Sequence, residues 1–295
     1  MVKRKTLTSV FAIVLFVILI LYTISLLFPI IWTFLVSLKS DDEFIFSLDA
    51  DIEVFLGWPR EGWAFSNYSA VFKYFKIETS SGDVYLPEMF FNGFSYAIVS
   101  ALITIFTNCV VAYVVAKYKC VLTSAIYTIV IVFMILPVIG TLPAELEIMN
   151  NLGFYDNMIG IFLMKIMFGG TNFLIFYAMF KSVSWSYAEA AFVDGASHFR
   201  VFFQIMLPMA VPTFFALVLM QFITLWNDWQ ASLIYFPSHP TIAYGLYRYA
   251  NSTGNEICVP YVMVACMMVA LPIIVLFLAF RNKIVGTIAV GGLKG

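Results

Sequence analysis

Asp228 has the surroundings in this sequence that are best suited to binding a polar ligand. It lies near the end of a long apolar stretch, in the run Trp226, Asn227, Asp228, Trp229. Carboxylate and amide groups exchange hydrogen bonds with hydroxyl groups, and the face of an indole ring covers apolar C–H surface such as one side of a pyranose. These four residues are therefore candidates for a substrate pathway. The alternative is that Asn227 and Asp228 seal a helix–helix contact or end a helix.

Three further polar residues interrupt apolar stretches and are weaker candidates. They are Asn108, Lys165 and Asn172. Polar groups are expensive to bury within a membrane, so each one is a reason to look for a function or a partner. For Lys165, we expect the side chain either to extend toward the membrane surface or to neutralise a carboxylate.

The sequence contains no pattern that indicates catalysis. It has no Gly-x-x-x-x-Gly-Lys-Ser/Thr loop that would bind nucleotide phosphates, and its His and Cys residues do not have the spacing of a metal site. His198 and His239 are isolated from one another along the chain. We therefore predict that the chain is not an enzyme and has neither a metal nor a cofactor.

Composition places the chain in the membrane. Of its residues, 62% are hydrophobic and 11% are charged, whereas a soluble domain has roughly 45–50% apolar and about 25% charged residues. We therefore expect the lipid bilayer as a partner and no nucleic acid.

Stretches without charges, or with Lys165 alone, predict six transmembrane helices. Each is longer than the roughly 20 residues that cross the hydrocarbon core, and continuous apolar runs of this length do not fit barrel strands. The predicted fold is an all-α polytopic membrane protein, with residues 1–295 forming a single domain. The spans are about 8–36, 90–116, 121–143, 158–180, 210–234 and 257–280. Pro137 and Pro143 should kink or end the third.

The distribution of basic residues predicts the orientation. Ten of the sixteen Lys and Arg residues lie in the termini and in the loops that share their side, and five lie on the other side. Because basic residues concentrate in cytoplasmic loops, we expect both termini to be cytoplasmic. The loop 39–88 is then external. It is acidic, which suits either a solvated loop or a docking surface, and its segment 67–76 has helical spacing.

The cytoplasmic loop 181–208 has a specific local pattern. Ser186 and Glu189 fit a capping box, so a helix should begin at Tyr187 and run to Val193. Gly195 supplies a turn with positive φ, Ser197 should cap a second helix, and Pro208 should limit its continuation. The loop also carries many aromatic residues, which are costly to expose unless protein or lipid covers them. The alternative is an amphipathic helix that only lies on the membrane.

This loop resembles the EAA loop of bacterial ABC importer permeases. The matching positions are Glu189, Ala190, Ala191, Gly195, Ile205, Leu207 and Pro208. Further segments of the sequence are similar to the carbohydrate-type permeases, the class of the smaller permease subunit of the maltose transporter. These segments include EAAFVDGAS from Glu189, LWNDW from Leu225 and the final GGLKG.

The resemblance implies a type I ABC importer permease fold in which this loop is a coupling helix seated in a cytoplasmic ATPase. It assigns ATPase coupling to Glu189, Ala190, Ala191, Asp194, Gly195 and Pro208. It further implies a pair of cytoplasmic ATP-binding subunits, a second homologous permease and an extracellular sugar-binding protein. The tail 281–295 is expected either to contact the ATPase pair or to be an unimportant end.

The expected function is that of a multi-pass permease in a bacterial cell membrane, which moves a carbohydrate such as an oligosaccharide by ATP-driven alternating access. One alternative is an importer of a non-sugar solute. Another is an ATP-independent secondary transporter, but such carriers place conspicuous ionisable residues in mid-membrane, where here only Asp228 and Lys165 come close. A structural anchor would leave the coupling-type loop without a purpose.

Overall fold

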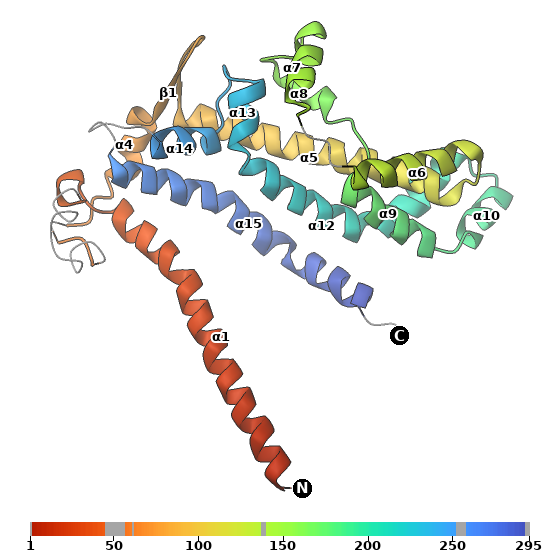
Figure 1. Ribbon diagram of the computed structural model, residues 1–295, viewed down its shortest axis with the longest axis horizontal. Helices are drawn as coiled ribbons and strands as arrows, with labels where there is room; N and C mark the ends of the chain where they lie inside the picture. Colours follow the sequence, from red (N-terminus) through yellow and green to blue (C-terminus); the bar gives the residue numbers. More distant parts are fainter. Residues whose placement is uncertain (1, 45–56, 61, 137–139, 252–257, 293–295) are drawn as a thin grey trace. The chain divides into compact units, whose positions relative to one another are not determined.

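The computed structural model describes residues 2–44, 57–60, 62–136, 140–251 and 258–292, and in residues 2–10 and 281–292 it describes the backbone alone. The described chain is mostly helical (Figure 1). It divides into two compact units, Met1–Lys76 with Leu246–Ala270, and Ile77–Gly245 with Leu271–Gly295.

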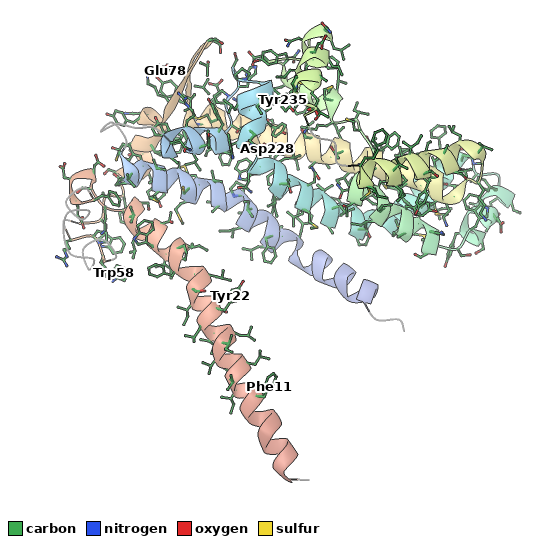
Figure 2. The ribbon with its side chains drawn as sticks, viewed as in Figure 1. Phe11, Tyr22, Trp58, Glu78, Asp228 and Tyr235 are labelled. Atoms are coloured by element: carbon green, nitrogen blue, oxygen red, sulfur yellow. The ribbon has the colours of Figure 1, made fainter. Side chains whose placement is uncertain are left out.

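The first unit contains the long helix α1 (Val2–Ser37) and the short helix α4 (Asn67–Tyr74), which matches the helix expected from the spacing of residues 67–76. Buried Asn67 links the two, because its Nδ2 donates to the carbonyl oxygens of Ser37 at 2.9 Å and Lys39 at 2.8 Å. By contrast, every side chain of α1 from Phe11 to Ile31 is exposed, and Figure 2 shows Phe11 and Tyr22 pointing away from the helix.

The second unit is organised around helix α5 (Leu86–Lys117), along which α12 (Leu207–Trp226) and α9 (Gly170–Ser182) pack (Figure 1). The buried face of α5 has many small residues, namely Gly93, Ala97, Ser100, Ala101, Cys109 and Ala112. Small residues let helix backbones approach closely within a membrane. At Gly93, α5 lies close to the indole of Trp226, since a Cβ built there would be in van der Waals contact with the ring at 3.5 Å.

Four helices among the described residues are long and apolar enough to cross a membrane. They are Phe11–Ser37, Leu86–Lys117, His198–Trp226 and Val259–Phe280, and they correspond to predicted spans one, two, five and six. The last belongs to α15 (Val259–Gly292), whose backbone stays helical through most of the predicted tail.

The third predicted span is shorter than expected. Helix α6 (Val121–Ile135) ends before the extended residue Leu136, which precedes Pro137. A residue before proline is biased away from helical geometry; Pro137 itself lies outside the described residues. Pro143 does not end this span. It lies in the first turn of another helix, α7 (Leu142–Asn151), where the missing N–H of proline costs nothing.

The fourth predicted span is two helices, α8 (Met158–Met164) and α9, so its expected continuity is wrong. Residues 165–169 separate them, and Gly169 and Gly170, where α9 begins, have φ of 133° and 67°, values that favour glycine and that a continuous helix does not contain. The amide of Gly169 donates to Asn108 Oδ1 of α5 at 2.8 Å. That bond supplies a partner for a backbone group that the break removes from the helical ladder.

One feature departs from the all-α expectation. Strands β1 (Lys76–Thr79) and β2 (Gly82–Tyr85) pair as a hairpin. Its turn contains Gly82 at φ 127°, and Thr79 Oγ1 donates to the carbonyl of Gly82 at 2.8 Å. The alternation of a four-residue strand is too short a signal to separate from loop sequence.

Candidate functional site

The loop 181–208 forms a helix, a tight turn and a second helix, as its sequence predicts. Helix α10 (Ser186–Val193) is followed by Gly195 and then by α11 (His198–Val201). The predicted capping box is wrong, because α10 begins at Ser186 itself and no side chain caps it. The hydroxyl of Ser186 instead bonds with that of Ser184 at 2.7 Å.

Gly195 closes α10 with a Schellman motif. Its φ is 80°, its amide donates to Phe192 O at 3.0 Å, and the amide of Ala196 donates to Ala191 O at 2.9 Å. These two bonds satisfy carbonyls at the helix end. A Cβ added at Gly195 would meet no atom of the chain within 4 Å. The glycine is therefore required by the backbone conformation, and the space beside it is open.

Ser197 caps α11 as predicted, since its Oγ accepts from the amide of Arg200 at 3.3 Å. Pro208, however, does not stop the helix. A π-helical turn, η1 (Phe202–Met206), connects α11 to α12, and Pro208 lies in the first turn of α12. Proline cannot donate to a carbonyl four residues earlier and its ring crowds that carbonyl. The wider turn accommodates this, with the amide of Leu207 bonded to Phe202 O.

Helix α10 has one packed face and one open face. Trp185, Ala188 and Phe192 recur at helical spacing on the packed side, where Ala188 is fully buried. The open side carries small and exposed residues with Val193, which is 88% exposed. Of the predicted coupling residues, Ala191 is half-buried and the rest are exposed, namely Glu189, Ala190, Asp194, Gly195 and Pro208. The chain therefore leaves these positions accessible to a partner.

Asp228, in the second candidate site, lies beside α5 and connects two helices. Its Oδ1 accepts from the amide of Ala231 at 3.0 Å and caps α13 (Trp229–Tyr235), and its Oδ2 accepts from Tyr96 Oη of α5 at 3.4 Å. Figure 2 places Asp228 at the junction of α12 and α13. Span five, predicted over 210–234, is therefore interrupted at Asn227 and Asp228. This is the helix-ending role that the sequence left open.

A polar cluster surrounds Asp228, and we define it as Tyr96, Glu145, Lys165, Asp228 and Tyr235. The ammonium of Lys165 lies 5.7 Å from the centre of the Tyr96 ring and interacts electrostatically with both Asp228 and Glu145. Tyr235 Oη donates to Glu145 Oε2 at 2.7 Å. Five segments contribute one residue each, and Lys165 lies among carboxylates, which is consistent with the second of the two roles expected for it.

The contact between α7 and α13 shifts the protonation of both its partners. The hydrogen bond from Tyr235 is the main reason that the pKa of the Glu145 carboxyl lies below its ordinary value. Burial first, and then the same bond, raises the pKa of Tyr235 to about 12. At neutral pH, Glu145 is therefore ionised and Tyr235 keeps its proton, which is the state that the bond requires.

The neighbours of Asp228 in sequence have different positions. Trp226 is 1% exposed. Its ring stacks on Phe222 with centroids 5.7 Å apart, and its other contacts include Phe90 edge-on at 5.3 Å. Asn227 is exposed and donates to Ile223 O at 2.8 Å, whereas Trp229 is half-buried. The Trp226 indole is thus part of the packing between α5 and α12, which leaves Asn227, Asp228 and Trp229 as accessible pathway candidates.

Two weaker candidates serve contacts between helices. Asn108 bonds to the break at Gly169, and Asn172 Nδ2 donates to Gln221 Oε1 of α12 at 3.3 Å. Sequence reasoning missed Tyr96, Glu145 and Tyr235. Glu145 follows Pro143 closely and could have been noticed as an acid at the edge of an apolar stretch, but no sequence signal pairs it with Tyr235. Among the described residues, no group of His, Cys, Asp and Glu could hold a metal ion.

Comparisons with known proteins identify the family of the chain. Residues 108–282, more than half of the chain, match the family described as binding-protein-dependent transport system inner membrane component. The chain is 26% identical over 300 residues to the arabinooligosaccharides transport system permease protein AraQ of Bacillus subtilis, with 100% of both chains covered. It is 24% identical to the diacetylchitobiose uptake system permease protein NgcG of Streptomyces coelicolor, over 95% of this chain and 88% of that one.

A solved structure shares the fold. It is a bacterial ABC transporter involved in the import of the acidic polysaccharide alginate. The match has a TM-score of 0.72 and 22% identity, and it covers 93% of this chain and 96% of the other.

Proposed function

This chain belongs to the family of binding-protein-dependent transport system inner membrane components, and from that premise we propose that it is the permease subunit of a bacterial ABC importer for a carbohydrate. The observation that carries the proposal is the family match. The matched residues include the loop 181–208, which has the open face of α10 and the turn at Gly195, and they include most of the polar cluster. The chain is a transport subunit, not an enzyme, so a separate subunit hydrolyses ATP.

An oligosaccharide is the substrate class that we propose. The names of two relatives refer to an arabinooligosaccharide and to diacetylchitobiose, both short sugars. On this chain, Asn227 and Asp228 offer amide and carboxylate groups for hydroxyls, and Trp229 offers an aromatic face. Trp226 contributes by positioning this segment, because its own ring is buried.

We place the ATPase on the open face of α10. Glu189, Ala190 and Asp194 are exposed there, and the space beside Gly195 is free of the chain's own atoms. Small residues permit close approach of another backbone, and Val193 supplies apolar surface that a partner would cover. The tail 281–295 is a second proposed ATPase contact.

The proposed mechanism requires the bundle of transmembrane helices to adopt two arrangements. ATP binding closes the ATPase pair and moves α10; the spans then change from inward-open to outward-open, accept the sugar from the binding protein, and reset after hydrolysis. ATP and the loaded binding protein each favour one arrangement, and their differential affinity supplies the shift. This scheme needs six spans with both termini cytoplasmic, a second homologous permease and an extracellular sugar-binding protein.

The proposal is tested by reconstituting the complete complex in vesicles. We expect ATPase activity to be stimulated by binding protein loaded with a neutral oligosaccharide, and uptake to require the ATPase subunits. Glu189→Lys should reduce uptake and ATPase association while membrane insertion is retained. Uptake that continues without the ATPase subunits would contradict the importer assignment, and stimulation by amino acids or peptides but by no sugar would contradict the carbohydrate assignment.

A further inference from the structure

The movement of the coupling loop needs a physical route into the membrane helices, and one contact is placed to provide it. We propose that Tyr118 and His198 form a latch that fixes the coupling loop to the cytoplasmic end of α5, and that both are positioning residues for coupling. This inference rests on the proposed function, because it assumes that the ATPase acts on α10.

The latch is a hydrogen bond surrounded by rings. Tyr118 follows the last residue of α5, and its Oη lies 2.8 Å from Nδ1 of His198, the first residue of α11. The ring of His198 lies 4.8 Å from that of Phe192, and the ring of Tyr118 lies 5.7 Å from that of Trp185. Trp185 and Phe192 come from the packed face of α10. Both ends of α10 are thus in contact with the pair.

A second set of contacts joins the same two regions. Lys117 Nζ of α5 donates to the carbonyl of Val183, three residues before α10. Tyr113, one turn earlier on α5, has its ring 4.9 Å from that of Phe202 in the π-helical turn and 5.4 Å from that of Phe180 in α9. The segment before α10 and the segment after α11 are therefore both attached to the last turn of α5.

Helix α5 connects this end of the unit to the polar cluster. Its 32 residues extend about 48 Å at 1.5 Å per residue. Tyr118 lies just beyond its last residue, Lys117, and Tyr96, about 32 Å earlier along the helix at the same rise, donates to Asp228. Figure 1 shows α10 and α13 at opposite ends of α5. A displacement of α10 that reaches Tyr118 therefore moves a single helix that also contacts Asp228.

The alternative is that the Tyr118–His198 contact only stabilises the loop. The two roles differ in what they predict. A stabilising contact would affect assembly and all activities together, whereas a latch would leave the ATPase bound and active but would reduce the transport obtained for each ATP hydrolysed.

The test compares Tyr118→Phe, His198→Ala and the double variant in the reconstituted complex. Tyr118→Phe removes a single hydroxyl and keeps the ring contacts. For each variant, sugar uptake is divided by ATP hydrolysis, and ATPase association is measured by co-purification. We expect each single change to reduce sugar imported per ATP by about tenfold, within the usual range for coupling between sites. The double variant should be no worse than His198→Ala alone, because the bond is already lost in that variant.

Two controls make the outcome decisive. Tyr22→Phe removes a tyrosine hydroxyl from an exposed position on α1 and should leave uptake per ATP unchanged. His198→Asn offers an amide oxygen near the position of Nδ1 and should restore most of the coupling that His198→Ala loses. If His198→Asn were as defective as His198→Ala, or if the double variant lost the product of the single effects, the hydrogen bond would not be the latch.

The failure of the latch can be distinguished from failure of the proposed function. If Tyr118→Phe and His198→Ala kept normal uptake per ATP while Glu189→Lys reduced it, the latch would be wrong and the ATPase docking proposal would stand. If Glu189→Lys also had no effect, the docking proposal would fail first. If Tyr118→Phe lowered ATPase association and uptake in equal proportion, the contact would be structural and the latch would again be wrong.

Discussion

The two ends of α5 are stabilised by different chemistry. At the end next to α10, aromatic rings and a glycine turn stabilise α10 against α5, and its open face carries small and exposed residues. At the other end, two carboxylates, an ammonium and two phenols from five segments surround the break between α12 and α13. Ring packing depends little on pH or salt, whereas charge interactions depend on both. The first end is thus suited to transmitting motion, and the second to responding to polar ligands.

A substitution at Gly195 should have the largest effect, because it acts on the α10 end alone. At φ 80°, a β-branched residue is strongly disfavoured, so Gly195→Val should disrupt the turn that orients α10 and α11. We expect uptake to fall by at least about tenfold. The measurement is uptake of labelled sugar into vesicles, with membrane insertion confirmed by fractionation.

The matched variant at this position is Gly195→Asn. Asparagine tolerates the left-handed conformation, so it should preserve the turn while it adds a side chain to the open space. If Gly195→Asn is as defective as Gly195→Val, close approach of the ATPase is the main requirement. If Gly195→Asn retains most of the uptake, the backbone conformation is the main requirement. Normal uptake with Gly195→Val would remove the reason for treating this end as the coupling site.

Substitutions at Asp228 should give the second largest effect. They distinguish the contribution of its helix cap from the contribution of its charge. Asparagine caps a helix about as well as aspartate, whereas alanine costs about 1 kcal/mol of stability. Asp228→Asn should therefore keep the helix cap and raise the sugar concentration needed for half-maximal uptake, because the carboxylate is lost. Asp228→Ala should lower the melting temperature as well. Identical transport by wild type and Asp228→Asn would show that the carboxylate does not contact substrate.

The smallest effect is expected from the bond between Tyr235 and Glu145, and it should depend on pH. Since this bond lowers the pKa of Glu145, its stabilisation is fully present above the ordinary value of 4.5 and is lost as the pH falls through the lower folded-state pKa. The pair is partly exposed, so its contribution should be about 1 kcal/mol or less. Tyr235→Phe should lower the melting temperature slightly at pH 7.

The pH dependence is the control for this effect. The difference between wild type and Tyr235→Phe should be constant from about pH 6 to 8 and should shrink below about pH 4.5. A Tyr235→Phe difference that stayed constant down to acid pH would contradict the assigned bond.

The sequence predicted the loop 181–208 well because its residues are contiguous. Ser197 and Gly195 have local backbone roles, and the spacing of the loop alone specifies a helix, a turn and a helix. The capping box failed because Ser184, two residues before Ser186, engages the Ser186 hydroxyl. Competition of that kind depends on the local backbone path, which residue identities leave open.

The other end was predicted only in part, since its members come together through tertiary structure. Asp228 was recognisable from its neighbours, but Tyr96, Glu145 and Tyr235 lie far apart in sequence. Hydropathy also overestimated the length of span three and the continuity of span four. Apolar composition states which residues prefer lipid, whereas Pro137 and the pair Gly169 and Gly170 determine where the backbone can remain helical.

The π-helical turn at Phe202–Met206 sets a limit on insertions and deletions in this region. It connects α11 to α12 without a loop, so the orientation of α10 about the axis of α12 depends on how many residues separate them. Each residue of an α-helix advances the chain by about 100° around the axis. Deleting one residue between His198 and Ile205 would therefore turn the open face of α10 by about that angle, even though every residue that matches the EAA loop was kept. The length of this segment should consequently be as strictly constrained as the identity of Gly195.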